Sequence, residues 1–153
     1  MSLANVFAGR LRAGLLVPFA FFQVLGALTA GAILRLVFPA SSASNFLGST
    51  LLAPSITSSV AILLESAGTF LLSWLILNVS SSKFGRRRQA ALVGITLFLL
   101  ILVLGPLTGA SLNPARSLGP ALASGHLENL GVFVVGPLAG GAAAGVIGRM
   151  RRV

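Results

Sequence analysis

The residues best suited to chemistry form the tetrad Asn113-Pro114-Ala115-Arg116, which lies between two long apolar stretches. Asn is a favoured helix N-cap, and Pro in the next position has a fixed φ suited to a first helical turn. A helix is therefore predicted from Pro114 to about Ala123, where Ser and Gly follow. About ten residues at about 1.5 Å each reach roughly 15 Å, half the thickness of a bilayer. The sequence thus predicts a helix that enters a membrane without crossing it.

A helix that starts inside a membrane leaves unpaired backbone N–H donors and a partial positive charge, about half an elementary charge, at its first turn. Such an end is tolerated where it lines a watery cavity or is buried in protein. The side-chain amide of Asn113 and the guanidinium of Arg116 add further donors. Together these groups predict a site that donates hydrogen bonds to neutral, oxygen-bearing solutes and repels cations.

The surrounding sequence is compatible with a lipid environment. Hydrophobic residues make up 56% of the 153-residue chain, charged residues make up 8%, and the mean hydropathy is +0.99. We therefore predict an all-α membrane protein with a single transmembrane domain over residues 1–153. Four stretches are long and apolar enough to cross a bilayer as helices: roughly Gly14 to Phe38, Val60 to Ser80, Gln89 to Leu107, and Leu130 to Gly148.

The basic residues behind the net charge of +9 are grouped at the ends of these spans, which argues against a nucleic-acid partner. If the four spans alternate in direction, every Lys and Arg except Arg35 and Arg116 falls on one side. This asymmetry is the positive-inside pattern, so we expect both termini in the cytoplasm and the protein in the plasma membrane. The connection from Pro39 to Ser59 carries no charge and is expected to run over the outer surface without a chemical role.

The first and last spans match each other at a fixed offset, which indicates an internal repeat. Their directions are opposite on this topology, as an inverted repeat requires, and a chance match of Gly-rich and Ala-rich helices is the alternative. The segments before them also match, in a register that places Met1 opposite Arg116 and a first Asn-Pro-Ala just before Met1. The matched pairs are Val24 with Val134, Gly26 with Gly136, Leu28 with Leu138, Gly31 with Gly141, Ala32 with Ala142, Ser2-Leu3 with Ser117-Leu118, and Ala8 with Ala123.

The run from Gly109 to Ala121, with the tetrad at its centre, resembles the second signature loop of the aquaporin, or major intrinsic protein, family. Glu65 to Leu72 is similar to the family's fourth helix, Gln23 to Ala27 to its third, and Val135 to Pro137 to its sixth. The resemblance covers nearly the whole chain. It implies an inverted-repeat helical bundle of four transmembrane helices and one re-entrant half-helix, and a passive channel for water or small neutral solutes without a cofactor.

The resemblance also implies that parts of the family fold are missing. The family's first two helices and first Asn-Pro-Ala have no counterpart in this sequence, so the chain resembles the later two-thirds of a family member. A complete pore of the usual kind then requires a complementary N-terminal half, and the rival interpretation is a non-conducting fragment. The resemblance implies a homotetramer as the usual assembly, in which each complete subunit holds its own pore.

Residue by residue, the resemblance places Arg116, Ala110 and Ile101 in the family's narrow selectivity filter, next to the Asn113 tetrad. In aquaporin-type pores an arginine or the positive ends of half-helices exclude protons and cations. Ile101 and Ala110 make the filter apolar, similar to plant tonoplast intrinsic proteins, which pass water and often ammonia, urea or peroxide. The fourth filter residue belongs to the missing second helix, so the choice among these solutes and glycerol stays open. Glu65 and Gln23 take supporting structural positions.

Glu65 also allows a different interpretation, because it is the acidic residue inside a span. In a small four-helix exporter, a membrane carboxylate would alternate between a proton and a drug. This hypothesis leaves the tetrad without a role. His126 and Glu128 lie outside the last span, and such a pair does not make a metal site. Neither paired carboxylates nor a Ser/His/Asp arrangement is recognisable, so the sequence does not indicate an enzyme.

Overall fold

The computed structural model describes residues 1–38 and 47–151, and its regular elements over these residues are all helical. Four long helices are apolar and long enough to cross a membrane, and they agree with the predicted spans to within about one turn. The helices are α1 (Ser2–Phe7), the 3-10 turn η1 (Ala13–Leu15), α2 (Leu16–Val37), α3 (Ser58–Ser80), α4 (Arg86–Thr108), α5 (Pro114–Ser124) and α6 (Leu130–Met150).

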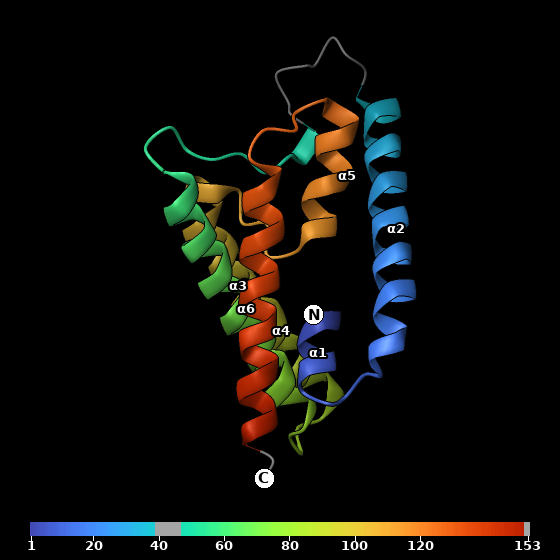
Figure 1. Cartoon of the computed structure of the whole chain (residues 1–153), viewed down its shortest axis with the longest axis vertical. Helices are drawn as coiled ribbons and strands as arrows, with labels where there is room; N and C mark the ends of the chain where they lie inside the picture. Colours follow the sequence, from blue (N-terminus) through green and yellow to red (C-terminus); the bar gives the residue numbers. More distant parts are fainter. Residues whose placement is uncertain (39–46, 152–153) are drawn as a thin grey trace.

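The two short helices lie between α2 and α6 and divide the height of the bundle between them (Figure 1). α5 occupies one half and α1 the other, with the N-terminus of the chain at mid-height and both helices running outward from there. The short helix α1 precedes α2 in the chain but packs mainly against α6. In the same way, α5 precedes α6 but packs mainly against α2. α2 and α6 run in opposite directions, as the predicted inverted repeat requires.

Glycine allows these helices to meet backbone to backbone. A Cβ added to Gly140 of α6 would lie 2.1 Å from the carbonyl oxygen of Ser66 in α3, and one added to Gly119 of α5 would lie 2.2 Å from that of Ala27 in α2. Real side chains do not approach this closely, so only glycine permits these separations. Among the described helices, the seam between α3 and α6 is the most extensive, and it holds the fully buried Glu65 and Phe133.

Burial is uneven among the four long helices. In their most apolar windows, only 6% of the residues of α2 and of α4 are buried, against 33% for α3 and 44% for α6. α4 contacts mainly α3, and α2 contacts mainly α5. The outer faces of α2 and α4 are therefore apolar surfaces that only lipid or another protein segment can cover.

Candidate functional site: the start of α5 and the loop before it

The helix start predicted at the tetrad is confirmed. α5 begins at Pro114, and Asn113 is its N-cap, with extended φ and ψ of −160° and 120°. The side-chain Oδ1 of Asn113 accepts a hydrogen bond of 3.2 Å from the backbone N–H of Ala115. The Nδ2 donors of this exposed side chain make no hydrogen bond among the described residues, so they are available to a solute. The helix ends at Ser124, where Gly125 takes a left-handed φ of 80°.

The loop that leads into α5 has an unusual backbone. Gly109, Ala110 and Leu112 have φ values of 74°, 47° and 54°, in the left-handed region. For a residue with a side chain this region costs on the order of 1–2 kcal/mol, so the surroundings must hold the loop in place. At Gly109 the surroundings are also tight, since a Cβ there would lie 2.9 Å from the Cα of Thr50.

The carboxylate of Glu65 provides that hold. It is fully buried and accepts hydrogen bonds from the backbone N–H groups of Ser111 (2.9 Å) and Leu112 (2.7 Å) and from the Thr108 hydroxyl (2.6 Å). A buried carboxylate with three donors is satisfied, and it fixes two successive amides of the strained loop. This geometry suits the supporting role that the sequence predicts for Glu65.

Three buried hydroxyl groups link this loop to α5 and to the chain before α3. Thr50 donates to Ser117 (2.8 Å), the Ser117 and Ser111 hydroxyl oxygens are 2.5 Å apart, and Ser111 donates to the carbonyl oxygen of Asn113 (3.2 Å). If Ser117 donates to Ser111, each hydroxyl donates once along one chain of bonds that ends at the N-cap. The hydroxyl chain therefore joins the segment before α3 to the start of α5, in addition to the bonds that Glu65 makes with the loop.

Arg116 is also held from the segment before α3. Its Nη1 donates a 2.7 Å hydrogen bond to the carbonyl oxygen of Gly48, and the side chain remains exposed. The expectation that the connection from Pro39 to Ser59 has no chemical role is wrong for its second part, since Gly48 and Thr50 both bind the α5 start. Residues 39–46 of this connection lie outside the described part of the chain. Sequence reasoning missed this contact because it joins residues far apart in the chain.

The remaining predicted residues lie at different depths of the surface. Ala110 is 5% exposed and packs with Leu104 and Leu112, whereas Ile101 on α4 is 48% exposed. The tetrad and Ala110 belong to one continuous segment, whereas Ile101 lies on another helix. That the tetrad, Ala110 and Ile101 form one common constriction stays a prediction. Gln23, on α2, donates a 2.8 Å hydrogen bond to the hydroxyl of Ser2 at the start of α1.

Comparison with models of known protein families matches residues 1–147 to the one described as major intrinsic protein. The chain belongs to the major intrinsic protein family. The predicted family membership is thereby confirmed, and with it a membrane protein that crosses the bilayer several times.

The relatives of this chain carry two kinds of name, aquaporin and glycerol uptake facilitator. The probable aquaporin NIP4-2 of Arabidopsis thaliana is 38% identical over 126 residues, which cover 82% of this chain and 43% of that protein. Aquaporin NIP1-1 of Zea mays is 37% identical over 144 residues, or 94% of this chain and 50% of that protein. The glycerol uptake facilitator protein-like 6 of Lactiplantibacillus plantarum is 40% identical over 132 residues, or 84% and 61%. The chain thus spans about half the length of the curated relatives it matches.

The fold of this major intrinsic protein has a counterpart among solved structures. The X-ray structure of the aquaglyceroporin from Plasmodium falciparum matches 97% of this chain and 67% of that chain, with a TM-score of 0.78 and 23% sequence identity. At this identity the likeness shows the fold alone. The predicted aquaporin-like helical bundle is confirmed, including the half-helix that begins at the tetrad.

Proposed function

We propose that the chain contributes a passive pore for water and small neutral solutes, with the start of α5 as its donor site. The observation that carries the proposal is the cap geometry of Asn113. Its Oδ1 is occupied by the Ala115 N–H, so the Nδ2 donors face outward together with the exposed guanidinium of Arg116. A passing water or carbonyl oxygen can accept from both groups, whereas a cation meets a helix dipole and a full positive charge.

The proposed solutes are neutral and small. Relatives carry the names aquaporin and glycerol uptake facilitator. Besides Arg116, two filter positions are assigned to this chain. Their residues, Ile101 and Ala110, are both apolar. An apolar wall opposite an arginine favours solutes with one polar side, so we include urea and ammonia with water and place ions outside the range. Transport of this kind makes and breaks no covalent bond.

The apolar faces of α2 and α4 support an assembly proposal. Since few residues on these helices are buried, we propose that a complementary N-terminal half or neighbouring subunits of a homotetramer cover part of them in the conducting form. We also propose a plasma-membrane protein with both termini in the cytoplasm, because basic residues follow α1, lie between α3 and α4, and end α6. A non-conducting fragment remains the rival function, and the transport assay below distinguishes the two.

The buried state of Glu65 argues against the exporter hypothesis. A carboxylate that alternates between a proton and a drug must be reached by both. Glu65 is 0% exposed, and its two oxygens accept one hydrogen bond from Thr108 at the end of α4 and two from the loop before α5. Releasing these donors would free the strained backbone rather than open a binding site.

Stopped-flow light scattering of proteoliposomes after an osmotic step tests the proposed function. We expect water flux at least about tenfold above that of empty vesicles, and Asn113→Asp should lower cation exclusion because a carboxylate replaces the amide donors. Asn129→Asp is the matched control, since Asn129 is exposed at the start of α6. Flux at the level of empty vesicles, from protein shown to be inserted, would identify a non-conducting fragment. Equal ion leak in both variants would remove Asn113 from the proposed site.

A further inference from the structure

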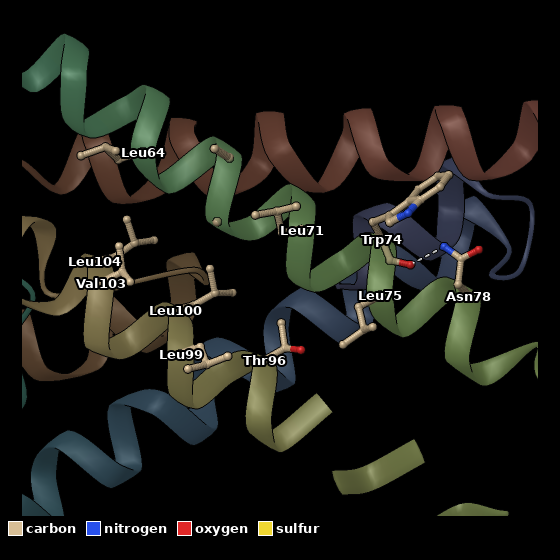
Figure 2. A pocket seen from close by; sticks show the side chains of 12 residues that line it. Leu64, Leu71, Trp74, Leu75, Asn78, Thr96, Leu99, Leu100, Val103 and Leu104 are labelled. Atoms are coloured by element: carbon tan, nitrogen blue, oxygen red, sulfur yellow. Dashed lines mark hydrogen bonds between the residues drawn. The ribbon is translucent and has the colours of Figure 1, made fainter. Parts of the chain in front are cut away.

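Two separate spaces lie along the seam between α3 and α4. The first is an apolar groove of about 610 Å³, which leucine side chains from both helices face (Figure 2). It belongs to the exposed apolar surface of α4 that the proposed assembly covers. The second is a hollow of about 490 Å³ at the end of the seam where α3 ends and α4 begins. The two spaces share no lining residue, so the hollow is a separate feature.

The hollow lies on the faces of α3 and α4 that also carry residues of the proposed pore. On α3, Ile76 lines the hollow and lies about three turns after Glu65. On α4, Ala90 lines it and lies about three turns before Ile101. Residues separated by whole turns share one face of a helix. Leu75, which lines the apolar groove, precedes Ile76 directly and therefore lies about 100° around α3. The hollow is thus in line with the proposed pore and is turned away from the groove.

The hollow is open, and two of its polar side chains can meet a solute. A Cβ added to Gly94, which lines the hollow, would meet no heavy atom within 4 Å. The exposed guanidinium of Arg86 makes no hydrogen bond among the described residues. The side-chain nitrogen of Gln89 donates to the Phe84 carbonyl oxygen (2.8 Å), which leaves the side-chain oxygen as an acceptor. The hollow therefore offers a charged donor and a neutral acceptor in a mainly apolar wall.

No acidic residue balances the positive charge of Arg86 in the hollow. The chain contains two acidic residues. Glu65 is fully buried in its bonds to Thr108 and to the loop before α5, and Glu128 lies in the α5–α6 connection at the opposite end of the bundle (Figure 1). A cation that enters the hollow is therefore repelled, whereas water or a neutral amide can bond to Arg86 and Gln89.

We propose that this hollow is one mouth of the pore and that Arg86 excludes cations from it. The inference rests on the passive pore proposed above, whose complementary half closes the open side of the hollow. Ile101 lies about two turns further along α4 than Gly94, or about 10 Å deeper. Arg86 and Arg116 then carry positive charge at two levels of one path. Repulsion at this mouth separates ammonia from ammonium before either reaches the start of α5.

Single cysteines provide a direct test, because the chain contains no cysteine of its own. Proteoliposomes with Ala90→Cys are treated on both sides with a methanethiosulfonate that carries either a sulfonate or a trimethylammonium group. We expect both reagents to modify the thiol and to lower the water flux towards that of empty vesicles. Adding Arg86→Gln should lower the ratio of the anionic to the cationic modification rate about fivefold, since loss of one charge changes the two rates in opposite directions. Gly94→Cys is a second position with the same expected result, because it has room for a side chain.

Arg87→Gln is the matched control for charge, since Arg87 is exposed beside Arg86 and does not line the hollow. It should leave the ratio of the two rates nearly unchanged. An equal decrease in the Arg86 and Arg87 variants would indicate diffuse surface charge and overturn the role of Arg86. Ala67→Cys is the control for position, because Ala67 lines the apolar groove. Treatment with either reagent should leave its water flux unchanged.

The remaining outcomes separate this inference from the proposed function. If the parent chain conducts water but neither cysteine in the hollow is modified, another segment fills the hollow, and the mouth is wrong while the pore stands. Modification of both cysteines without a change in flux would place the hollow outside the path and likewise overturn the mouth alone. If the inserted parent chain does not conduct water, the passive pore is wrong and the mouth with it.

Discussion

The two short helices, α5 and α1, take equivalent places in the inverted repeat, yet different kinds of contact hold them. The start of α5 is fixed by polar bonds: Asn113 caps it, Glu65 holds the loop before it, and three hydroxyls join it to the segment before α3. α1 has no side-chain cap, and close packing of Ala4 on Gly145 together with Gln23 and Arg10 holds it. The polar bonds are thus concentrated where the donor site is proposed, while small-residue packing suffices to position a helix.

This difference has a physical origin in the loop before α5. A left-handed backbone at Ala110 and Leu112 is unfavourable, and only contacts that outweigh the strain can maintain it. Hydrogen bonds to a buried carboxylate are among the strongest available inside a protein.

Removal of Glu65 should have the largest effect on the start of α5. Glu65→Ala leaves two backbone N–H groups and the Thr108 hydroxyl without their acceptor. We expect a loss on the order of 3 kcal/mol or more, because each buried unsatisfied donor costs about 1–3 kcal/mol. In a thermal unfolding experiment in detergent, this corresponds to a decrease in Tm of roughly 6–12 °C. Water flux in proteoliposomes should fall with it, since the loop before α5 loses its conformation.

The other acidic residue is the natural control for this prediction. Glu128 is exposed in the α5–α6 connection, so Glu128→Ala removes the same charge without breaking a buried hydrogen bond. Its Tm should stay within about 2 °C of the parent chain. If both variants unfold at the same temperature, Glu65 does not hold the loop.

Two glycine substitutions should affect α1, which is held mainly by packing, differently from α5, which is also held by hydrogen bonds. Gly145→Ala places a Cβ 2.5 Å from the carbonyl oxygen of Ala4 in α1, and Gly119→Ala places one 2.2 Å from that of Ala27 in α2. Each methyl group should cost about 1–3 kcal/mol by overpacking. Because α1 has fewer polar bonds, we expect it to separate from α6 in Gly145→Ala, with hydrogen exchange over residues 2–9 accelerated about tenfold. The bonded α5 should stay in place in Gly119→Ala, so the cost there appears as a lower Tm.

Gly141→Ala is the matched control for both, because a Cβ at Gly141 meets no heavy atom within 4 Å. It should change neither the exchange rates nor Tm beyond the small gain in helix propensity. Accelerated exchange of residues 114–124 in Gly119→Ala, equal to that of α1 in Gly145→Ala, would show that the polar bonds add nothing to packing.

The parts of the site that sequence predicts are those with local signals. Asn113 before Pro114 indicates a capped helix start, and a stretch of apolar residues is sufficient to indicate each long helix. The repeat register, which pairs Ser2-Leu3 with Ser117-Leu118, is the signal for α1, although sequence reasoning did not identify this segment as a helix. These features depend on residues close together in the chain, and local physical chemistry determines them.

The contacts that join distant segments could not be predicted in the same way. Thr50 and Gly48 lie in an uncharged connection with no periodic pattern, and their contacts with Ser117 and Arg116 depend on how the whole bundle packs. One general signal was available: a hydroxyl in an apolar membrane protein needs a hydrogen-bond partner. That signal indicates that Thr50 is bonded, but the identity of its partner follows only from the fold.

The smallest expected effect concerns that hydroxyl. Thr50→Val keeps the shape of the side chain and removes the donor to Ser117, whose hydroxyl still pairs with that of Ser111. Because no buried donor is left unpaired, we expect a loss of about 1 kcal/mol, or roughly 2–4 °C in Tm. Thr50→Ser retains the hydroxyl and should recover most of the loss. Thr29→Val is the control, since Thr29 is exposed on α2 and bonds only within its own helix. Equal Tm values for the Thr50 and Thr29 valine variants would mean that Glu65 alone holds the start of α5, whereas the expected difference would show that the segment before α3 shares that role.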